Sequence, residues 1–255
     1  MVKSAYRVTQ ILEAVSSRRR GLKHSEIADI LKIPKGSLSL LLADLVMQQY
    51  LAHDNDGRRY MLGPQVLVIA KRYLAGLDIV RLGEPVLRQL VADVGECGEI
   101  AVKRGNEILV VCREDCSRPL RSVIQIGERA PLYSTAAGKA ILAFTPQEEI
   151  DAYLASTDLK ALTKKPALNL KALRKELDAI RSGAVAYSRE ELNEGVIAMA
   201  LPVFDFHGLV AGSIVVPMPT IRFNPRKEKK IETCLREATF RLSQQLGHEE
   251  VRSAE

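Results

Sequence analysis

The 255-residue sequence contains no apolar run that approaches the ~18 residues needed to cross a bilayer. Its first ten residues, MVKSAYRVTQ, do not place an apolar segment after a charged one, so a secretion signal is not expected. Four cysteines are too few for a disulfide framework, and free thiols are the expectation. These absences predict a cytoplasmic protein with no membrane partner.

Motifs for catalysis and metal binding are also missing. There is no nucleophile–base set, phosphate loop or dinucleotide fingerprint, and the adjacent Glu190 and Glu191 would point in different directions rather than share a site. Cys112 and Cys116 are four residues apart, with Cys97 upstream, but zinc sites prefer tighter pairs with further ligands nearby. We therefore expect no enzyme, no cofactor and no metal. A redox role for Cys112 and Cys116 rests on their spacing alone and is left open.

Charge is distributed unevenly along the chain. Residues 1–76 contain 12 Lys and Arg but 6 Asp and Glu, whereas the other 179 residues contain 25 of each sign. The whole excess of +6 therefore belongs to the N-terminal part. A small basic domain attached to a neutral larger one suits a polyanionic partner, although a solvated basic face would give the same count.

The first 63 residues have the pattern of a winged helix-turn-helix. Apolar residues at helical spacing predict helices over residues 4–17, 25–31 and 35–48, with a break at Pro34 before the third. Two strands, residues 49–53 and 58–63, flank a polar turn at 54–57 and form the predicted wing. Arg58 and Arg59 are expected to emerge at its tip, where cations can contact phosphate.

The start of the third helix carries the predicted DNA contacts. Small and polar residues there lie on the face opposite the leucines, and free backbone N–H groups at a helix start can bind phosphate. Leu40, near the same outer face, would contact either a thymine methyl group or a neighbouring protein. The candidate DNA-binding residues are Arg7, Ser25, Lys35, Gly36, Ser37, Ser39, Leu40, Arg58 and Arg59.

The segment GLKHSEIADILKIPKGSLSLLLADLVMQQYLAHDNDGRRYMLG resembles the winged helix-turn-helix of IclR-type bacterial transcription regulators. PLYSTAAGKA at 131–140, SREELNEGV at 188–196 and PVFD at 202–205 resemble the second domain of that family, in the same order. The resemblance implies a homodimer, often a dimer of dimers, on a palindromic double-stranded operator. It also implies a linker helix, which residues 64–76 fit, and a GAF-like domain that senses a small molecule. The expected domain bounds are 1–63 for the winged helix-turn-helix, 64–77 for the linker helix and 78–255 for the GAF-like domain that binds the effector and forms oligomers.

The C-terminal part itself has the pattern of an α+β domain with a mostly antiparallel sheet. A turn is expected at Gly105-Asn106. Helices are predicted over residues 78–94, 136–144, 146–156, 169–182 and 227–246. Strands are predicted over residues 99–103, 107–113, 121–126, 185–187, 196–204 and 209–216.

In the family that the chain resembles, the loop matching residues 133–138 lines the effector pocket, and its free N–H groups could hold a carboxylate. A tight helix start packed on the sheet is an equally good explanation of its small residues. Ser188 and Ala198 replace the Asp and Cys usual in relatives that bind small acids, which predicts a larger or less polar ligand, or none. The candidate effector-binding residues are Tyr133, Ser134, Thr135, Ala136, Ala137, Ser188, Ala198, Val215 and Pro217.

Together these patterns predict a DNA-binding transcription regulator, repressor or activator, controlled by a small-molecule effector. The alternative is a ligand-binding or hydrolytic GAF-like protein whose helix-turn-helix serves only for dimerisation.

Overall fold

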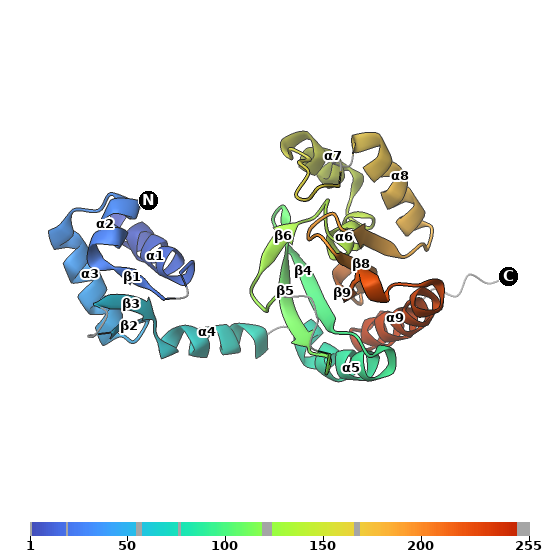
Figure 1. Cartoon of the computed structure of the whole chain (residues 1–255), viewed down its shortest axis with the longest axis horizontal. Coiled ribbons are helices and arrows are strands. Elements are labelled where there is room, and N and C mark those ends of the chain that lie inside the picture. Colours follow the sequence, from blue (N-terminus) through green and yellow to red (C-terminus); the bar gives the residue numbers. More distant parts are fainter. Residues whose placement is uncertain are drawn as a thin grey trace. The chain divides into compact units, whose positions relative to one another are not determined.

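The computed structural model describes residues 2–18, 20–54, 58–75, 78–118, 124–165 and 169–248. The chain divides into two units, Met1–Gly76 and Leu77–Glu255, each with its own core (Figure 1). Within the described residues, no helix has the length and apolar character that a membrane span requires. Of the predicted wing turn, residues 55–57 lie outside the described residues.

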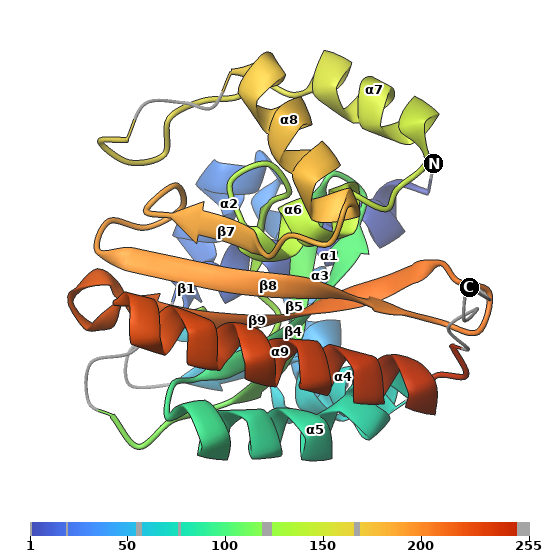
Figure 2. The same cartoon turned by 90° about the vertical axis from the view of Figure 1, so that its right-hand side faces the viewer.

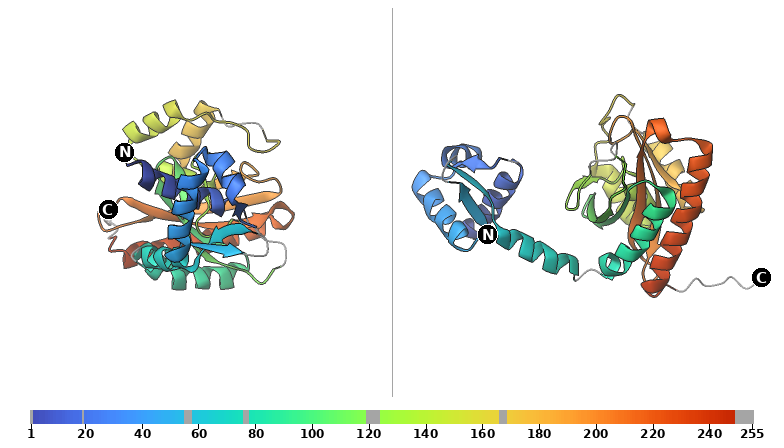
Figure 3. Two further views of the ribbon diagram at one scale, coloured as in Figure 1. Left: turned by 90° about the vertical axis from the view of Figure 1, so that its left-hand side faces the viewer. Right: turned by 60° about the horizontal axis from the view of Figure 1, so that its bottom comes forward.

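The N-terminal unit is a winged helix-turn-helix, as predicted (Figure 3). Its strands form an antiparallel sheet in the order β1-β3-β2, and the two-residue strand β1 was not anticipated from the sequence. The elements are α1 (Lys3–Ser16), β1 (Leu22–Lys23), α2 (His24–Leu31), α3 (Lys35–Met47), β2 (Leu51–Asp54), β3 (Arg59–Leu62) and α4 (Pro64–Ala75).

The packing of α3 shows why this helix presents its start to solvent. Pro34 is its N-cap and prevents α2 from continuing into it. Leu38, Leu42 and Leu45 are buried against the other helices, whereas Leu40 is 71% exposed. The inner face is thus fixed by the core, and the opposite face is left for a partner.

The C-terminal unit is an α+β domain built on one six-stranded antiparallel sheet, in the order β6-β5-β4-β9-β8-β7. Helices α5 and α9 lie side by side on one face of the sheet, and α6 packs on the other face with α7 and α8 beyond it (Figure 2). The helices are α5 (Asp78–Val94), α6 (Ala136–Leu142), α7 (Gln147–Ser156), α8 (Leu170–Arg181) and α9 (Pro225–Gln245). The strands are β4 (Gly98–Arg104), β5 (Glu107–Glu114), β6 (Arg129–Pro131), β7 (Ala186–Arg189), β8 (Val196–Phe204) and β9 (Val210–Pro219).

The strand predicted over residues 121–126 is wrong in its described part, because residues 124–126 are not in a strand. The edge strand is β6, which begins at Arg129. Gly127 adopts a left-handed conformation, with φ +90°, and its N–H bonds to the carbonyl of Val110. Val110 in turn donates to the carbonyl of Glu128, so this turn leads directly into the pairing of β6 with β5, which a hydrophobic pattern does not reveal.

The close approach of α6 to the preceding loop depends on glycine at 138. A Cβ atom added at Gly138 would lie 2.2 Å from the carbonyl oxygen of Leu132. Thr135 caps the helix, because its Oγ1 accepts from the Gly138 N–H at 3.0 Å. The small residues therefore let α6 rest directly on the sheet, between β8 and β9 on one side and α8 on the other.

Candidate functional site

The predicted DNA-binding residues lie on α1, α2, α3 and the wing of the N-terminal unit. Lys35, Gly36, Ser37, Ser39 and Leu40 are all exposed at the start of α3. The Ser39 hydroxyl donates to the carbonyl of Lys35 at 2.9 Å, and the His24 ring lies 3.0 Å from it. Ser39 is therefore held in place from both helices of the motif.

The remaining candidates occupy α1, α2 and the wing. Ser25 and Arg58 are exposed, and Arg7 is half-buried on α1. Arg58 directly follows the undescribed residues of the wing and has a left-handed backbone, with φ 50°.

Arg59 does not emerge at the wing tip as the sequence suggested. Its Nη1 donates to the carbonyl of Gly21 at 3.0 Å and to Glu26 Oε2 at 3.3 Å. Glu26 in turn accepts from the backbone N–H of Lys23 at 2.7 Å, and this hydrogen bond, with the Arg59 charge, keeps the pKa of the Glu26 carboxyl below its usual value. The guanidinium thus joins the wing to the start of α2, because β3 pairs with β1 and places Arg59 opposite Lys23.

A pocket opens between the sheet of the C-terminal unit and the start of α6, and we call it the sheet pocket. The cavity itself is small, about 40 Å³, and about 450 Å³ of space lies within its walls when the open solvent at its mouth is included. Seven of the predicted effector residues line it: Thr135, Ala136, Ala137, Ser188, Ala198, Val215 and Pro217. The other lining residues, none of them among the predicted effector-binding residues, are Glu99, Ile108, Ile124, Leu192, Asn193 and Val196.

Strand register explains why distant residues meet in the sheet pocket. Ser188 pairs with Ala198 across β7 and β8, and Ala198 pairs with Pro217 across β8 and β9. Val215 pairs with Glu99 across β9 and β4. With Ile108 on β5, the wall of the pocket therefore consists of residues from five neighbouring strands.

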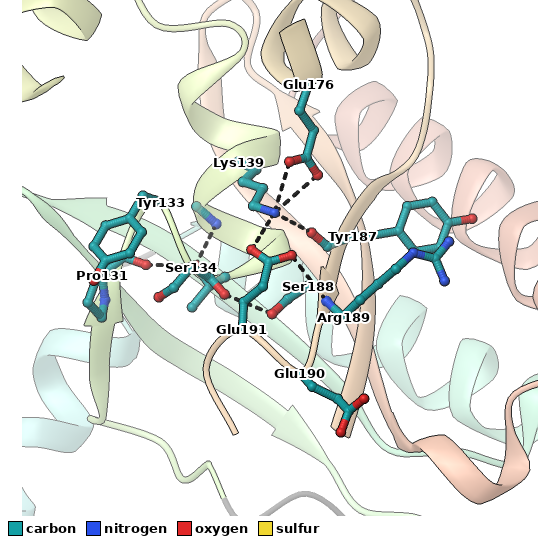
Figure 4. Close-up of polar contacts among 12 residues, drawn as sticks. Pro131, Tyr133, Ser134, Lys139, Glu176, Tyr187, Ser188, Arg189, Glu190 and Glu191 are labelled. Carbon is teal, nitrogen blue, oxygen red and sulfur yellow. Dashed lines mark hydrogen bonds and ion pairs between the residues drawn. The ribbon is translucent and has the colours of Figure 1, made fainter. Parts of the chain in front are cut away.

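Tyr133 and Ser134 support the pocket instead of lining it. The Tyr133 hydroxyl donates to the carbonyl of Lys160 at 3.0 Å. The Ser188 hydroxyl donates to the carbonyl of Ser134 at 2.7 Å, which ties β7 to the loop before α6 (Figure 4). Thr135 donates to the carbonyl of Pro131 and accepts from Gly138. Because these hydrogen bonds occupy Ser188 and Thr135, the pocket is less polar than its residue types suggest.

Glu99 is the one carboxyl group among the described residues that line the pocket, and it is only 3% exposed. Its Oε1 accepts from Arg113 Nη1 at 2.7 Å. Burial raises the pKa of Glu99 to about 7, against the opposing effect of the Arg113 charge. None of the described residues that line the pocket carries a positive charge.

Beside the pocket lies a buried lysine network (Figure 4). Lys139 on α6 is fully buried, which is rare for an ammonium group without partners. Its Nζ lies 3.0 Å from Glu176 Oε2 on α8 and 2.6 Å from Glu191 Oε2, and it donates to the carbonyl of Tyr187 at 2.9 Å. This one group joins α6, α8 and β7 to the loop that carries the pocket residues Leu192 and Asn193.

Glu190 and Glu191 diverge, as the sequence indicated. Glu190 accepts from the backbone N–H of Gly195 at 3.0 Å, whereas Glu191 pairs with Lys139. Within the described residues, His, Cys, Asp and Glu form no group of three that could hold a metal ion.

Comparison with known proteins places both units in one family. The family model of the IclR helix-turn-helix domain matches residues 4–55, and that of the bacterial transcriptional regulator IclR C-terminal domain matches residues 71–244. The HTH-type transcriptional regulator KdgR of Escherichia coli is 27% identical over 97% of this chain and 94% of its own. KipR of Bacillus subtilis is 28% identical over 88% of this chain and 89% of its own.

Solved structures show the same fold. The C-terminal domain of E. coli KdgR matches with a TM-score of 0.61 at 29% identity, covering 67% of this chain and 99% of that one. IclR of Thermotoga maritima matches with a TM-score of 0.81 at 24% identity, covering 97% of this chain and 100% of that one.

Proposed function

The chain belongs to the IclR family of bacterial transcription regulators, and we propose that α3 reads operator DNA under the control of a small molecule held in the sheet pocket. The observation that carries the DNA-binding part is the exposed start of α3, where Lys35, Gly36 and Ser37 are accessible while the leucines behind them are buried. Lys35 and Arg58 contact phosphate, and Ser37 and Leu40 face the bases. Arg59 acts from within the domain by holding the wing.

Salt-dependent binding tests the assignment of the phosphate contacts. Lys35→Ala together with Arg58→Ala is expected to weaken operator binding in a gel shift and to flatten its dependence on salt. Removing the cation that neutralises one phosphate changes the slope of log K against log salt by about 0.9. Lys171→Ala, an exposed lysine on α8, is the matched control and should change neither quantity. An unchanged affinity and slope in the double variant would contradict the assignment.

The dimer expected for this family would use α4. Leu67, Val68 and Ile69 on this helix are 72%, 40% and 43% exposed, an apolar surface that a second copy would cover. Two α3 helices would then reach half-sites one helical turn, or a multiple of it, apart. Leu67→Glu is expected to shift the sedimentation of the protein towards the monomer.

The protein is proposed to act in the cytoplasm, with DNA and the effector as its partners.

The ligand of the sheet pocket is proposed to be a mainly apolar molecule with a hydroxyl or amine group that donates to Glu99. The buried carboxyl group and the absence of cations among the described lining residues disfavour a small carboxylate. Thermal-shift screening of hydroxylated and amine-bearing apolar compounds, followed by a gel shift with each hit, would identify it. Tight calorimetric binding of glyoxylate or pyruvate would overturn this proposal. Failure to bind any upstream DNA fragment would favour a ligand-binding protein that uses its helix-turn-helix only for dimerisation.

A further inference from the structure

Two cysteines that are 19 residues apart in sequence meet in the C-terminal unit. The Sγ atoms of Cys97 and Cys116 are 2.7 Å apart, and the side chains are buried with Val91. Cys112, which the sequence spacing paired with Cys116, lies instead within β5 opposite Ile100 on β4. The spacing therefore selected the wrong partner for Cys116, and the structure provides a different pair.

The backbone places both cysteines near the same end of one hairpin. Strands β4 and β5 form a hairpin whose last pair is Gly98 with Glu114. Cys97 and Cys116 lie just beyond that pair, at the open end of the hairpin. Continuing the register would place Cys97 opposite Asp115, so Cys116 lies one residue beyond the position that faces Cys97.

Both sides of the pair are anchored. The backbone N–H of Cys116 donates to Cys97 Sγ at 3.2 Å. Beside Cys97, the buried Glu96 accepts from Arg222 Nη2 at 2.6 Å, and the carbonyl of Gly95 accepts from Arg118 at 2.9 Å. The sulfur atoms need to approach by about 0.7 Å to reach the ~2.05 Å of a disulfide bond.

We propose that Cys97 and Cys116 are a reversible redox pair that closes to a disulfide when the protein meets a peroxide. The sulfur of Cys116, the more exposed of the two, attacks one peroxide oxygen, which breaks the O–O bond and gives a sulfenic acid and one water. The sulfur of Cys97 then attacks the sulfenic sulfur and releases the second water. The two sulfur atoms are oxidised, the two peroxide oxygens are reduced, and both thiol protons leave in the waters.

Cys97 is the poorer nucleophile for the first step, because it is the more deeply buried of the two thiols. Burial and the contact with the Cys116 thiol raise the pKa of Cys97 to about 11, against the effect of the Cys116 N–H, so it remains a thiol at neutral pH. Once formed, the bond would brace the hairpin end next to Glu99 and Arg113, the ion pair at the wall of the sheet pocket. Oxidation would in this way act on the part of the protein that holds the ligand.

Peptide mapping of the full-length protein tests the proposal without reference to DNA or ligand. After treatment with hydrogen peroxide, blocking of free thiols and digestion, we expect a cross-linked peptide that joins Cys97 to Cys116 and that dithiothreitol removes. Cys116→Ser and Cys97→Ser should abolish it. Cys112→Ser and Cys234→Ser, which alter the other two thiols, should leave it unchanged.

A thermal melt gives a second measurement. The peroxide-treated wild-type protein should melt at a higher temperature than the reduced protein, and the difference should be absent from Cys116→Ser. Wild-type protein that keeps all four thiols open to blocking reagent after treatment, or whose only cross-link involves Cys234, would overturn the proposal. Because these wild-type results need no variant to fold, they decide the question by themselves.

Discussion

Removal of the buried ammonium group of Lys139 is the most direct test of how the C-terminal unit holds its pocket. Lys139→Met keeps the length of the side chain but leaves Glu176 and Glu191, whose side chains are 29% and 19% exposed, without their cation. Loss of one partner from a buried ion pair costs about 3–5 kcal/mol. Because both carboxylates retain some contact with water, we expect the lower end, about 3 kcal/mol.

The sign of the pH dependence adds a second criterion. Burial already raises the pKa of Glu176, and Lys139 opposes this rise. Without Lys139 the carboxyl pKa in the folded protein rises further, so the folded state holds its proton more tightly than the unfolded state does. The destabilisation should therefore be small at low pH and grow as the pH rises through the carboxyl range.

Urea unfolding of wild-type and variant protein at about pH 5 and about pH 7.5 measures both effects. Lys175→Met, an exposed lysine on the same α8 that carries Glu176, is the matched control and should cost little. Adding Glu176→Gln and Glu191→Gln to Lys139→Met should recover part of the loss. A cost below about 1 kcal/mol at neutral pH, or an equal cost at both pH values, would refute the reasoning.

Two further predictions concern the sheet pocket and the packing of α6. The folded pKa of Glu99, about 7 against an ordinary 4.5, means that stability falls as the pH rises between these values, by on the order of 3 kcal/mol. Glu99→Gln should flatten that part of a plot of melting temperature against pH, and an unchanged slope would show that Glu99 is not the group responsible. Gly138→Ala should cost about 1–3 kcal/mol or more in urea unfolding, because the new Cβ meets the Leu132 carbonyl. Gly36→Ala, where nothing lies within 4 Å, should cost nothing, and equal effects would contradict the steric argument.

Local patterns in the sequence were sufficient to predict most of the elements. The helix over residues 78–94 and the strand over 196–204 were predicted with the bounds that the structure gives. Such elements are long and strongly periodic, so the hydrophobic pattern of their own side chains sets their type and bounds. The two-residue β1 and the late start of β6 carry no such pattern, because pairing with a neighbouring strand defines them.

The residues of the sheet pocket likewise include some that the sequence predicted and others, Glu99 among them, that it did not. Most of the predicted effector-binding residues line the sheet pocket, as the family resemblance implied: residues 135–137, Ser188, Ala198, Val215 and Pro217. That they bind an effector stays a prediction. Glu99 was not anticipated, because nothing near it in sequence marks it. It reaches the pocket through its pairing with Val215, more than a hundred residues later.

The sequence by itself determined a basic helix-turn-helix, an α+β domain after it and the small residues that start α6, since each is a property of a short stretch of chain. Only the tertiary structure decided the partners of individual side chains. It turned Arg59 inward to Gly21, enclosed Lys139 between two glutamates and paired Cys116 with Cys97 instead of Cys112. The physical reason is common to all three: strand register and helix packing bring together groups from distant stretches of chain, and spacing along the sequence does not record those distances.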